Sequence, residues 1–238
     1  MTEPLAPRDR LIVALDAPGL QEAKTLLDRL AGVVEWFKVG SQLFTATGPA
    51  AVELVLKRGG RVFLDLKYHD IPQVVGGAVR EATRLGVGLL TVHASGGTAM
   101  LRAAAQAGAD GGPARPRLLA VTILTSLDRA ILQRELQVPV SVAGQVVHLA
   151  GLARAAGCDG VVAAPPEARQ LRLTLGPEAL IVTPGVRPAG ADAGDQRRIA
   201  TPAAAIRAGA DYLVVGRPIT GAPDPAAAAE AILRELAG

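Results

Sequence analysis

The chain has 238 residues, enough for one large domain or two small ones, and half of them are hydrophobic. Aromatic residues make up only 3%, which excludes single-stranded nucleic-acid binding on stacked aromatic side chains. The formal net charge of +3, without a stripe of Lys and Arg, gives no indication of a nucleic-acid partner and is compatible with an anionic small molecule.

The N-terminal residues, the apolar runs and the single cysteine bear on where in the cell the protein is expected. The residues from Met1 to Arg10 lack the apolar stretch of a signal peptide. No apolar run reaches the roughly 18 residues of a membrane span. Cys158 can form no internal disulfide and is expected to be a buried, inert thiol. We therefore expect a cytoplasmic protein with no membrane partner.

Short apolar or β-branched runs alternate along the chain with amphipathic segments. The runs predict strands at 11–15, 33–39, 62–66, 89–93, 118–123, 160–163, 179–183 and 212–215. The segments between them predict helices at 20–30, 49–57, 72–85, 98–107, 140–156, 166–175, 202–208 and 225–236. Prolines near the first turn of five of these helices are typical start signals.

This alternation predicts an α/β protein with a parallel sheet. Eight strand–helix units in a chain of this length match the (β/α)8 TIM barrel, here a single domain spanning residues 1–238. A doubly wound open sheet is the alternative. Its dinucleotide-binding version has no support, because no Gly-x-Gly-x-x-Gly follows the first strand.

The carboxyl ends of the predicted strands carry polar or charged residues in seven of eight cases. Barrel enzymes place their chemistry at these ends, whereas the amino ends here carry little beyond arginine and glycine. The one-sided distribution therefore predicts a catalyst. The residues concerned are Asp16, Lys38, Asp65, Lys67, His93, Thr125, Arg187 and Arg217.

The stretch from Asp65 to Pro72 ends the third strand with unusual charge. If that strand is extended, Asp65 and Lys67 point to the same face. Asp16 and Lys38 lie beside them if the first three strands are neighbours. Charges of alternating sign held partly out of water are costly unless paired, so the array predicts a site. A structural ion-pair network is the alternative.

Two arginine-bearing loops follow the seventh and eighth strands. Residues 185–187 and Gly216-Arg217 offer backbone N–H groups and guanidinium forks, as in barrel phosphate sites. Plain turns with surface arginines are the alternative. The long stretch 185–201, which holds Arg187 and Gln196, predicts a lid over the phosphate, with simple disorder as the other interpretation.

The predicted site favours no metal ion and no cofactor. Lys38 and Lys67 occupy the places where a metal site would need further carboxylates. His69 follows Lys67 by two residues and His93 ends the fourth predicted strand, but each is more typical of a hydrogen-bonded scaffold histidine than of a catalytic group.

Seven short motifs occur along the chain in the same order as in a known enzyme family. With them, the chain resembles the orotidine 5'-phosphate decarboxylase family over residues 11–236. The motifs are Ala14-Leu15-Asp16, Lys38-Val39-Gly40, Asp65-Leu66-Lys67-Tyr68-His69-Asp70-Ile71-Pro72, Leu124-Thr125-Ser126, Thr183-Pro184-Gly185-Val186-Arg187, Asp195-Gln196 and Val215-Gly216-Arg217-Pro218-Ile219-Thr220. The Asp-x-Lys-x-x-Asp core alone is shared with sugar-phosphate enzymes. Ser41-Gln42 and Val74 depart from the usual pattern.

The resemblance implies cofactor-free decarboxylation of orotidine 5'-phosphate to uridine 5'-phosphate in pyrimidine biosynthesis. It implies that Asp16 and Lys38 hold the ribose hydroxyls, with Lys38 also paired to Asp65. Asp65 is expected beside the substrate carboxylate. Lys67 is expected to protonate the ring carbon that loses carbon dioxide.

The resemblance also implies a homodimer with shared sites. Asp70 and Ile71 are expected to reach the neighbouring subunit's site, where Asp70 helps to aim Lys67. Thr125 is expected to bond the pyrimidine amide edge. The phosphate is expected to bind Gln196, Arg217 and the backbone of Gly216, with Arg187 on the lid over 185–200.

Two rival functions stay open at this point. Sugar-phosphate enzymes such as 3-keto-L-gulonate-6-phosphate decarboxylase and hexulose-6-phosphate synthase use magnesium and have a glutamate where this chain has Lys38. A non-catalytic nucleotide-binding protein on the same barrel is the other.

Overall fold

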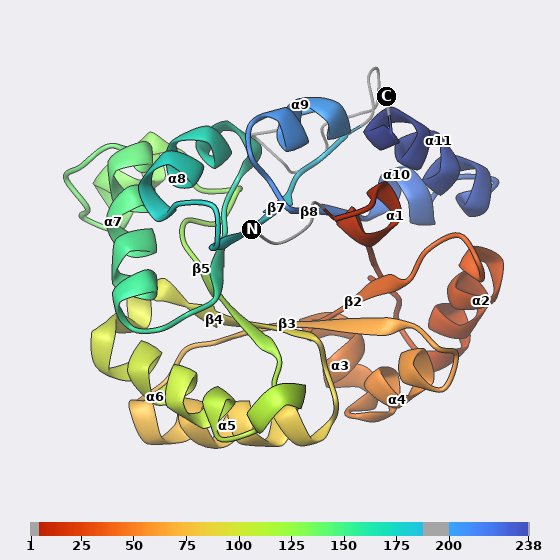
Figure 1. Cartoon of the computed structure of the whole chain (residues 1–238), viewed down its shortest axis with the longest axis horizontal. Helices are drawn as coiled ribbons and strands as arrows, with labels where there is room; N and C mark the ends of the chain where they lie inside the picture. Colours follow the sequence, from red (N-terminus) through yellow and green to blue (C-terminus); the bar gives the residue numbers. More distant parts are fainter. Residues whose placement is uncertain (1–4, 188–199, 238) are drawn as a thin grey trace.

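A computed structural model of the protein describes residues 5–187 and 200–237. Eight parallel strands close into a barrel in the order β1 to β8, with helices around the outside (Figure 1). The strands are β1 (Leu11–Ala14), β2 (Trp36–Gly40), β3 (Arg61–Tyr68), β4 (Leu89–His93), β5 (Arg117–Val121), β6 (Gly160–Val162), β7 (Leu180–Pro184) and β8 (Tyr212–Val215). The predicted TIM barrel is confirmed.

Closure of the barrel joins the two ends of the chain. β1 pairs with β8 in parallel register, with Leu11 opposite Leu213 and Ile12 opposite Val214. Because every strand has a neighbour on both sides, the sheet has no open edge. The open doubly wound sheet is thereby ruled out.

The eight predicted helices are all present, with ends shifted by a few residues at most. They are α2 (Leu20–Leu30), α4 (Ala50–Leu56), α5 (Pro72–Arg84), α6 (Gly97–Ala109), α7 (Val142–Ala155), α8 (Ala168–Leu175), α9 (Pro202–Arg207) and α11 (Pro225–Ala237). Three further short helices were not predicted: α1 (Pro7–Arg10), α3 (Ser41–Thr47) and α10 (Arg217–Thr220). None of the three has a side-chain cap, so the sequence offers no start signal of that kind.

Two apolar cores follow from the alternation of side chains along the strands. Leu11 and Val13 of β1 face the helices and belong to the larger core, which fills the space between sheet and helices. Ile12 and Ala14 face inward and belong to a smaller core inside the barrel, together with Trp36 and other inward residues. The barrel is thus packed through its centre, as is usual for this fold.

Strand β3 departs from regular geometry near its carboxyl end. It continues to Tyr68, beyond the predicted end at residue 66, and its register against β4 shifts between Leu64 and Tyr68. Lys67 adopts φ 51°, in the left-handed region that residues other than glycine rarely occupy. The expectation of a simply extended strand through residue 67 was therefore wrong in its local geometry.

The amino end of the barrel holds a carboxylate, Asp159, with several donors. Arg115 donates to it twice, at 2.6 and 2.7 Å, and Arg117 donates at 3.1 Å. The backbone N–H of Leu118 donates at 2.8 Å. Burial acts to raise the pKa of Asp159, but these hydrogen bonds outweigh it and hold the pKa below the ordinary value.

Asp211 repeats this arrangement two strands further on, so the expectation that the amino ends carry little beyond arginine and glycine was wrong. Arg172 donates to it at 2.6 Å, and the backbone N–H of Ile181 donates at 2.7 Å. Cys158, next to Asp159, has its pKa raised to about 12, first by burial and then by that carboxylate. The expectation of an inert thiol agrees with this shift, because the reactive thiolate is disfavoured.

Candidate active site

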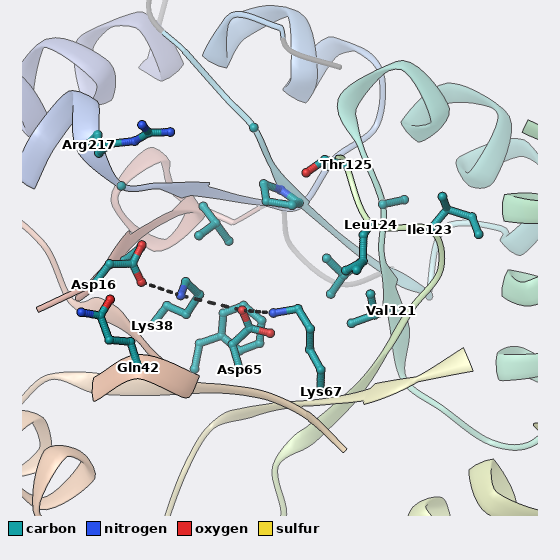
Figure 2. A pocket seen from close by; sticks show the side chains of 18 of the residues that line it. Asp16, Lys38, Gln42, Asp65, Lys67, Val121, Ile123, Leu124, Thr125 and Arg217 are labelled. Carbon is teal, nitrogen blue, oxygen red and sulfur yellow. Dashed lines mark hydrogen bonds and ion pairs between the residues drawn. The ribbon is translucent and has the colours of Figure 1, made fainter. Parts of the chain in front are cut away.

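A pocket of about 500 Å³ lies at the carboxyl ends of the strands. Its size is typical of small-ligand sites. Figure 2 shows Asp16, Lys38, Asp65 and Lys67 as a row along one side, with Thr125 and Arg217 on the other. The residues of the predicted rim, apart from His93, therefore line one pocket.

The position of the charged row follows from the inward face of the first three strands. On β3, the inward residue Phe63 belongs to the core inside the barrel, and Asp65 and Lys67 come next on the same side. On β2, Trp36 is the inward core residue and Lys38 follows it. Each strand thus places an apolar side chain in the barrel and a charged one at its mouth.

The charges of the row alternate and lie in contact. Lys38 Nζ is 3.1 Å from Asp16 Oδ1 and 3.8 Å from Asp65 Oδ2. Lys67 Nζ donates to Asp65 Oδ2 at 2.8 Å. The side chain of Asp65 is only 12% exposed, whereas that of Asp16 is 59% exposed. Asp65 is therefore the buried centre of the row, with a lysine on either side.

Gly40 makes room for Lys38. A Cβ at Gly40 would lie 2.8 Å from Lys38 Nζ, closer than real Cβ atoms approach. Any larger residue at this position displaces the ammonium group from Asp16 and Asp65. The Lys-Val-Gly motif thus has a steric reason for its glycine.

Thr91, which sequence reasoning missed, touches two members of the row. Its side chain is fully buried in β4. The hydroxyl donates to Asp65 Oδ1 at 3.0 Å and accepts from the backbone N–H of Lys67 at 2.9 Å. The only available signal was a polar residue at an inward position of an otherwise apolar strand.

His69 and His93 lie next to the row but do not line the pocket. Their ring centroids are 5.3 Å apart. Burial lowers the pKa of His93, and His69 and Lys67 lower it further against the opposing effect of Asp65. The neutral imidazole is favoured, which suits the predicted scaffold role better than proton transfer.

The groups predicted to bind the pyrimidine and the phosphate belong to the same pocket, and Gly216 lies next to Asp16. Thr125, Arg187, Gly216 and Arg217 all line it. The guanidinium of Arg187 donates to the backbone carbonyl of Val186 at 2.9 Å, and its side chain is largely buried. These four predicted residues are thus brought together with the charged row.

Three predicted residues are not placed in this pocket. Asp70 and Ile71 lie outside it on the surface, and Ile71 is 64% exposed. Gln196 lies outside the described residues, as does most of the predicted lid over 185–200. Asp70 accepts from the backbone N–H of Ile71 at 2.6 Å, so the turn before α5 presents both residues to solvent.

Gln42 lines the pocket, although sequence reasoning did not place it there. It comes from α3, the helix that directly follows β2, and lies beside Asp16 and Lys38 in Figure 2. Ile123 and Leu124 add apolar surface near Thr125. A helix after β2 was not predicted, so nothing indicated that residue 42 would turn toward the site.

The described ranges, 5–187 and 200–237, contain neither a membrane-spanning helix nor a metal-binding cluster. Within them, no helix has the length and apolar character needed to cross a membrane. Nor do they contain a group of three or more His, Cys, Asp and Glu side chains arranged to hold a metal ion.

Comparison with known proteins decides the family. A model described as the orotidine 5'-phosphate decarboxylase / HUMPS family matches residues 9–232. The chain belongs to this family. Membership of the orotidine 5'-phosphate decarboxylase / HUMPS family confirms the resemblance drawn from the motifs.

Individual relatives agree with this assignment. The orotidine 5'-phosphate decarboxylase of Moorella thermoacetica is 58% identical over 234 residues, which cover 96% of this chain and 92% of the relative. That of a Methylobacterium species is 53% identical, covering 100% of this chain and 99% of the relative. The crystal structure of the Lactobacillus acidophilus enzyme matches with a TM-score of 0.86 at 39% identity, covering 97% and 100% of the two chains.

Proposed function

We propose that this chain catalyses the decarboxylation of orotidine 5'-phosphate to uridine 5'-phosphate and carbon dioxide, a step of pyrimidine biosynthesis carried out in the cytoplasm. The observation that carries the proposal is the row of Asp16, Lys38, Asp65 and Lys67 in one pocket. The relatives named for this enzyme, which match nearly the whole chain, support it.

The chemistry needs a fixed positive charge. Breaking the bond between the pyrimidine ring and its carboxylate leaves the electron pair on a ring carbon that has no adjacent carbonyl to delocalise it. An ammonium group next to that carbon stabilises the charge and then supplies the proton. Lys67 takes this role, and its contact with Asp65 at 2.8 Å aims it into the pocket.

Asp65 lies where the substrate carboxylate leaves. Its negative charge near that carboxylate disfavours the bound substrate relative to the product, in which the carboxylate has gone. Lys38 and Asp16 bind the ribose hydroxyls, since both side chains line the pocket next to Asp65. The row thus spans the substrate from its sugar to its reacting carbon.

The phosphate binds at the loops that follow β7 and β8. Arg217, the backbone of Gly216 and Gln196 hold it, with Arg187 as an additional cation. Thr125 bonds the amide edge of the pyrimidine. Binding energy from these contacts, distant from the reacting carbon, organises the site around the ring.

The enzyme works as a homodimer in this proposal. Asp70 and Ile71 lie outside their own subunit's pocket and are exposed, which leaves them available to a neighbouring subunit. Asp70 then adds a second carboxylate beside the partner chain's Lys67. Ile71 contributes apolar surface over the pyrimidine ring.

The catalyst needs no metal ion or other cofactor in this proposal. Lys67 provides the positive charge that a metal or an electron-sink cofactor would otherwise supply. Lys38 also distinguishes the chain from the magnesium-dependent sugar-phosphate members, because an ammonium 3.8 Å from Asp65 repels a cation at that carboxylate.

The test is the change in absorbance as orotidine 5'-phosphate becomes uridine 5'-phosphate, measured with and without a chelator. We expect equal rates under both conditions. Loss of activity in the chelator would contradict the cofactor-free mechanism. Binding of the nucleotide without turnover would instead favour the non-catalytic rival.

A further inference from the structure

Strand β3 carries two extra residues opposite β4 at the centre of the site. Leu64 pairs with Leu90, and the next pair is Tyr68 with Val92. Three residues of β3, the segment 65–67, therefore face Thr91 alone. In a regular parallel pair one residue faces one, so this segment is a bulge.

In the bulge, the backbone N–H of Lys67 has a side chain as its hydrogen-bond acceptor, the hydroxyl of Thr91. Lys67 has φ 51°, a strained conformation for a residue other than glycine. Its N–H donates to the Thr91 hydroxyl at 2.9 Å instead of to a strand carbonyl. The side chain of Thr91 thus replaces a missing ladder bond where the backbone is strained.

The same hydroxyl also holds the carboxylate at the centre of the row. It donates to Asp65 Oδ1 at 3.0 Å, while Lys67 Nζ donates to Oδ2 at 2.8 Å. A hydroxyl has one proton to give and lone pairs to receive, so both contacts form at once. Thr91 is fully buried, so water cannot substitute for it.

We propose that Thr91 is a positioning residue for the decarboxylation. It fixes the bulge that turns the Lys67 side chain back onto Asp65, and it orients the Asp65 carboxylate between the two lysines. This inference rests on the proposed function, because it assigns a role within that site. Thr91 does not line the pocket and acts only through Asp65 and Lys67.

The expected effect is on turnover rather than on binding. Without the hydroxyl, the Lys67 N–H and one oxygen of Asp65 lose their buried partners, and the segment 65–67 relaxes to find others. Displacement of a catalytic group by about 1 Å is costly to the chemical step. Thr91 acts through Asp65 and Lys67, which are proposed to lie at the reacting carbon and not at the phosphate or the pyrimidine amide edge, so we expect substrate affinity to be preserved.

The test compares Thr91→Val, which keeps the shape, with Thr91→Ser, which keeps the hydroxyl. For Thr91→Val we expect kcat to fall by about tenfold to a hundredfold, while KM stays within about threefold of the wild-type value. For Thr91→Ser we expect at least about half of the wild-type kcat. Should the valine variant not fold, Thr91→Ala takes its place with the same expected split.

Thr122→Val is the matched control. Thr122 is also nearly buried, and its hydroxyl donates to the carbonyl of Val162 at 3.0 Å. That carbonyl keeps the backbone N–H of Thr122 as a donor after the substitution. We expect its kcat to stay within about twofold of wild type.

Three results would overturn the inference. They are an unimpaired kcat in Thr91→Val, a KM that rises in proportion to the loss, and a serine variant as impaired as the valine variant. With an active wild type, each would leave the proposed function intact. A wild type that does not convert orotidine 5'-phosphate would overturn the proposed function and this inference together.

Discussion

The two ends of the barrel hold their carboxylates in different ways. At the amino end, Asp159 receives a two-pronged contact from Arg115, one from Arg117 and one from a backbone N–H. At the carboxyl end, Asp65 receives lysine ammonium groups and the hydroxyl of Thr91. The first arrangement fixes a carboxylate from several directions, whereas the second leaves its cations able to change partners.

The choice of cation matters to this difference. A guanidinium fork and a backbone amide match the two oxygens of a carboxylate and have little freedom once bound. An ammonium is a compact charge on a flexible stem and can turn from Asp65 toward a substrate carbon. We therefore expect substitutions at the amino end to lower the free energy of unfolding and substitutions at the carboxyl end to lower turnover.

The largest effect is expected from Lys67→Ala. Removing both the positive charge and the proton donor lowers turnover by about a thousandfold or more. The free energy of unfolding should change by less than about 1 kcal/mol, because the lysine side chain is one-third exposed. Absorbance assays and thermal unfolding check the two values.

Binding of uridine 5'-phosphate is the control for this variant, and it should remain measurable. Retention of more than about a tenth of wild-type turnover, a change under roughly 1.4 kcal/mol, would sink the assigned role.

A restoration of activity is expected when two inactive variants are mixed. If Asp70 serves the partner's site, a mixed dimer of Lys67→Ala and Asp70→Ala chains has one site with both defects and one with neither. Random exchange then restores roughly a quarter of wild-type activity. Absence of recovery, after subunit exchange has been demonstrated with labelled chains, would argue against a shared site.

At the amino end, Asp159→Asn should act on stability alone. Removing the charge leaves Arg115 and Arg117 without their carboxylate, and we expect a loss of about 1–3 kcal/mol in the free energy of unfolding, since both arginines are partly solvated. Urea unfolding measures the loss, and kcat/KM should be unchanged.

Asp28→Asn is the matched control for this variant. Asp28 pairs with Arg58 at 2.9 Å but is 54% exposed, so the same change should cost under about 0.5 kcal/mol. Equal losses at the two positions would contradict the special contribution of Asp159.

The smallest effect is a pH dependence of the same carboxylate. The folded pKa of Asp159 lies below the ordinary 3.8, so its stabilisation is complete above that pH and is lost as the pH falls through the folded pKa. The gap in unfolding temperature between wild type and Asp159→Asn should therefore narrow on acidification below 3.8. A difference in unfolding temperature that stays constant with pH would show that hydrogen bonding without the charge accounts for the stabilisation by Asp159.

The sequence was sufficient for the barrel and for most of the rim. Period-two and helical patterns are local, and parallel strands bring their carboxyl ends to one edge of the sheet. Asp16, Lys38 and Asp65 could therefore be assigned to one site from the sequence. Gly216 and Arg217 could be added by the same reasoning about strand ends.

The bulge in β3 could not be predicted in this way. Lys67 has a left-handed conformation, and its backbone N–H donates to the hydroxyl of Thr91, 24 residues away. Nothing in the residues around Lys67 indicates it, since a lysine there is expected in the extended region. Gln42 was missed because α3 starts at Ser41, and the residue before it, Gly40, has no side chain to cap the helix.

Closure of β1 on β8 has a consequence for the order of events during synthesis. The charged row comes from the first three strands, but Gly216 and Arg217 follow the last one. A chain emerging from the ribosome therefore carries all four charges of the row long before it carries the groups proposed to receive the phosphate. Substrate can therefore make its full set of contacts only with the finished barrel. Nascent fragments that end before residue 212 have neither the closing strand nor a complete site.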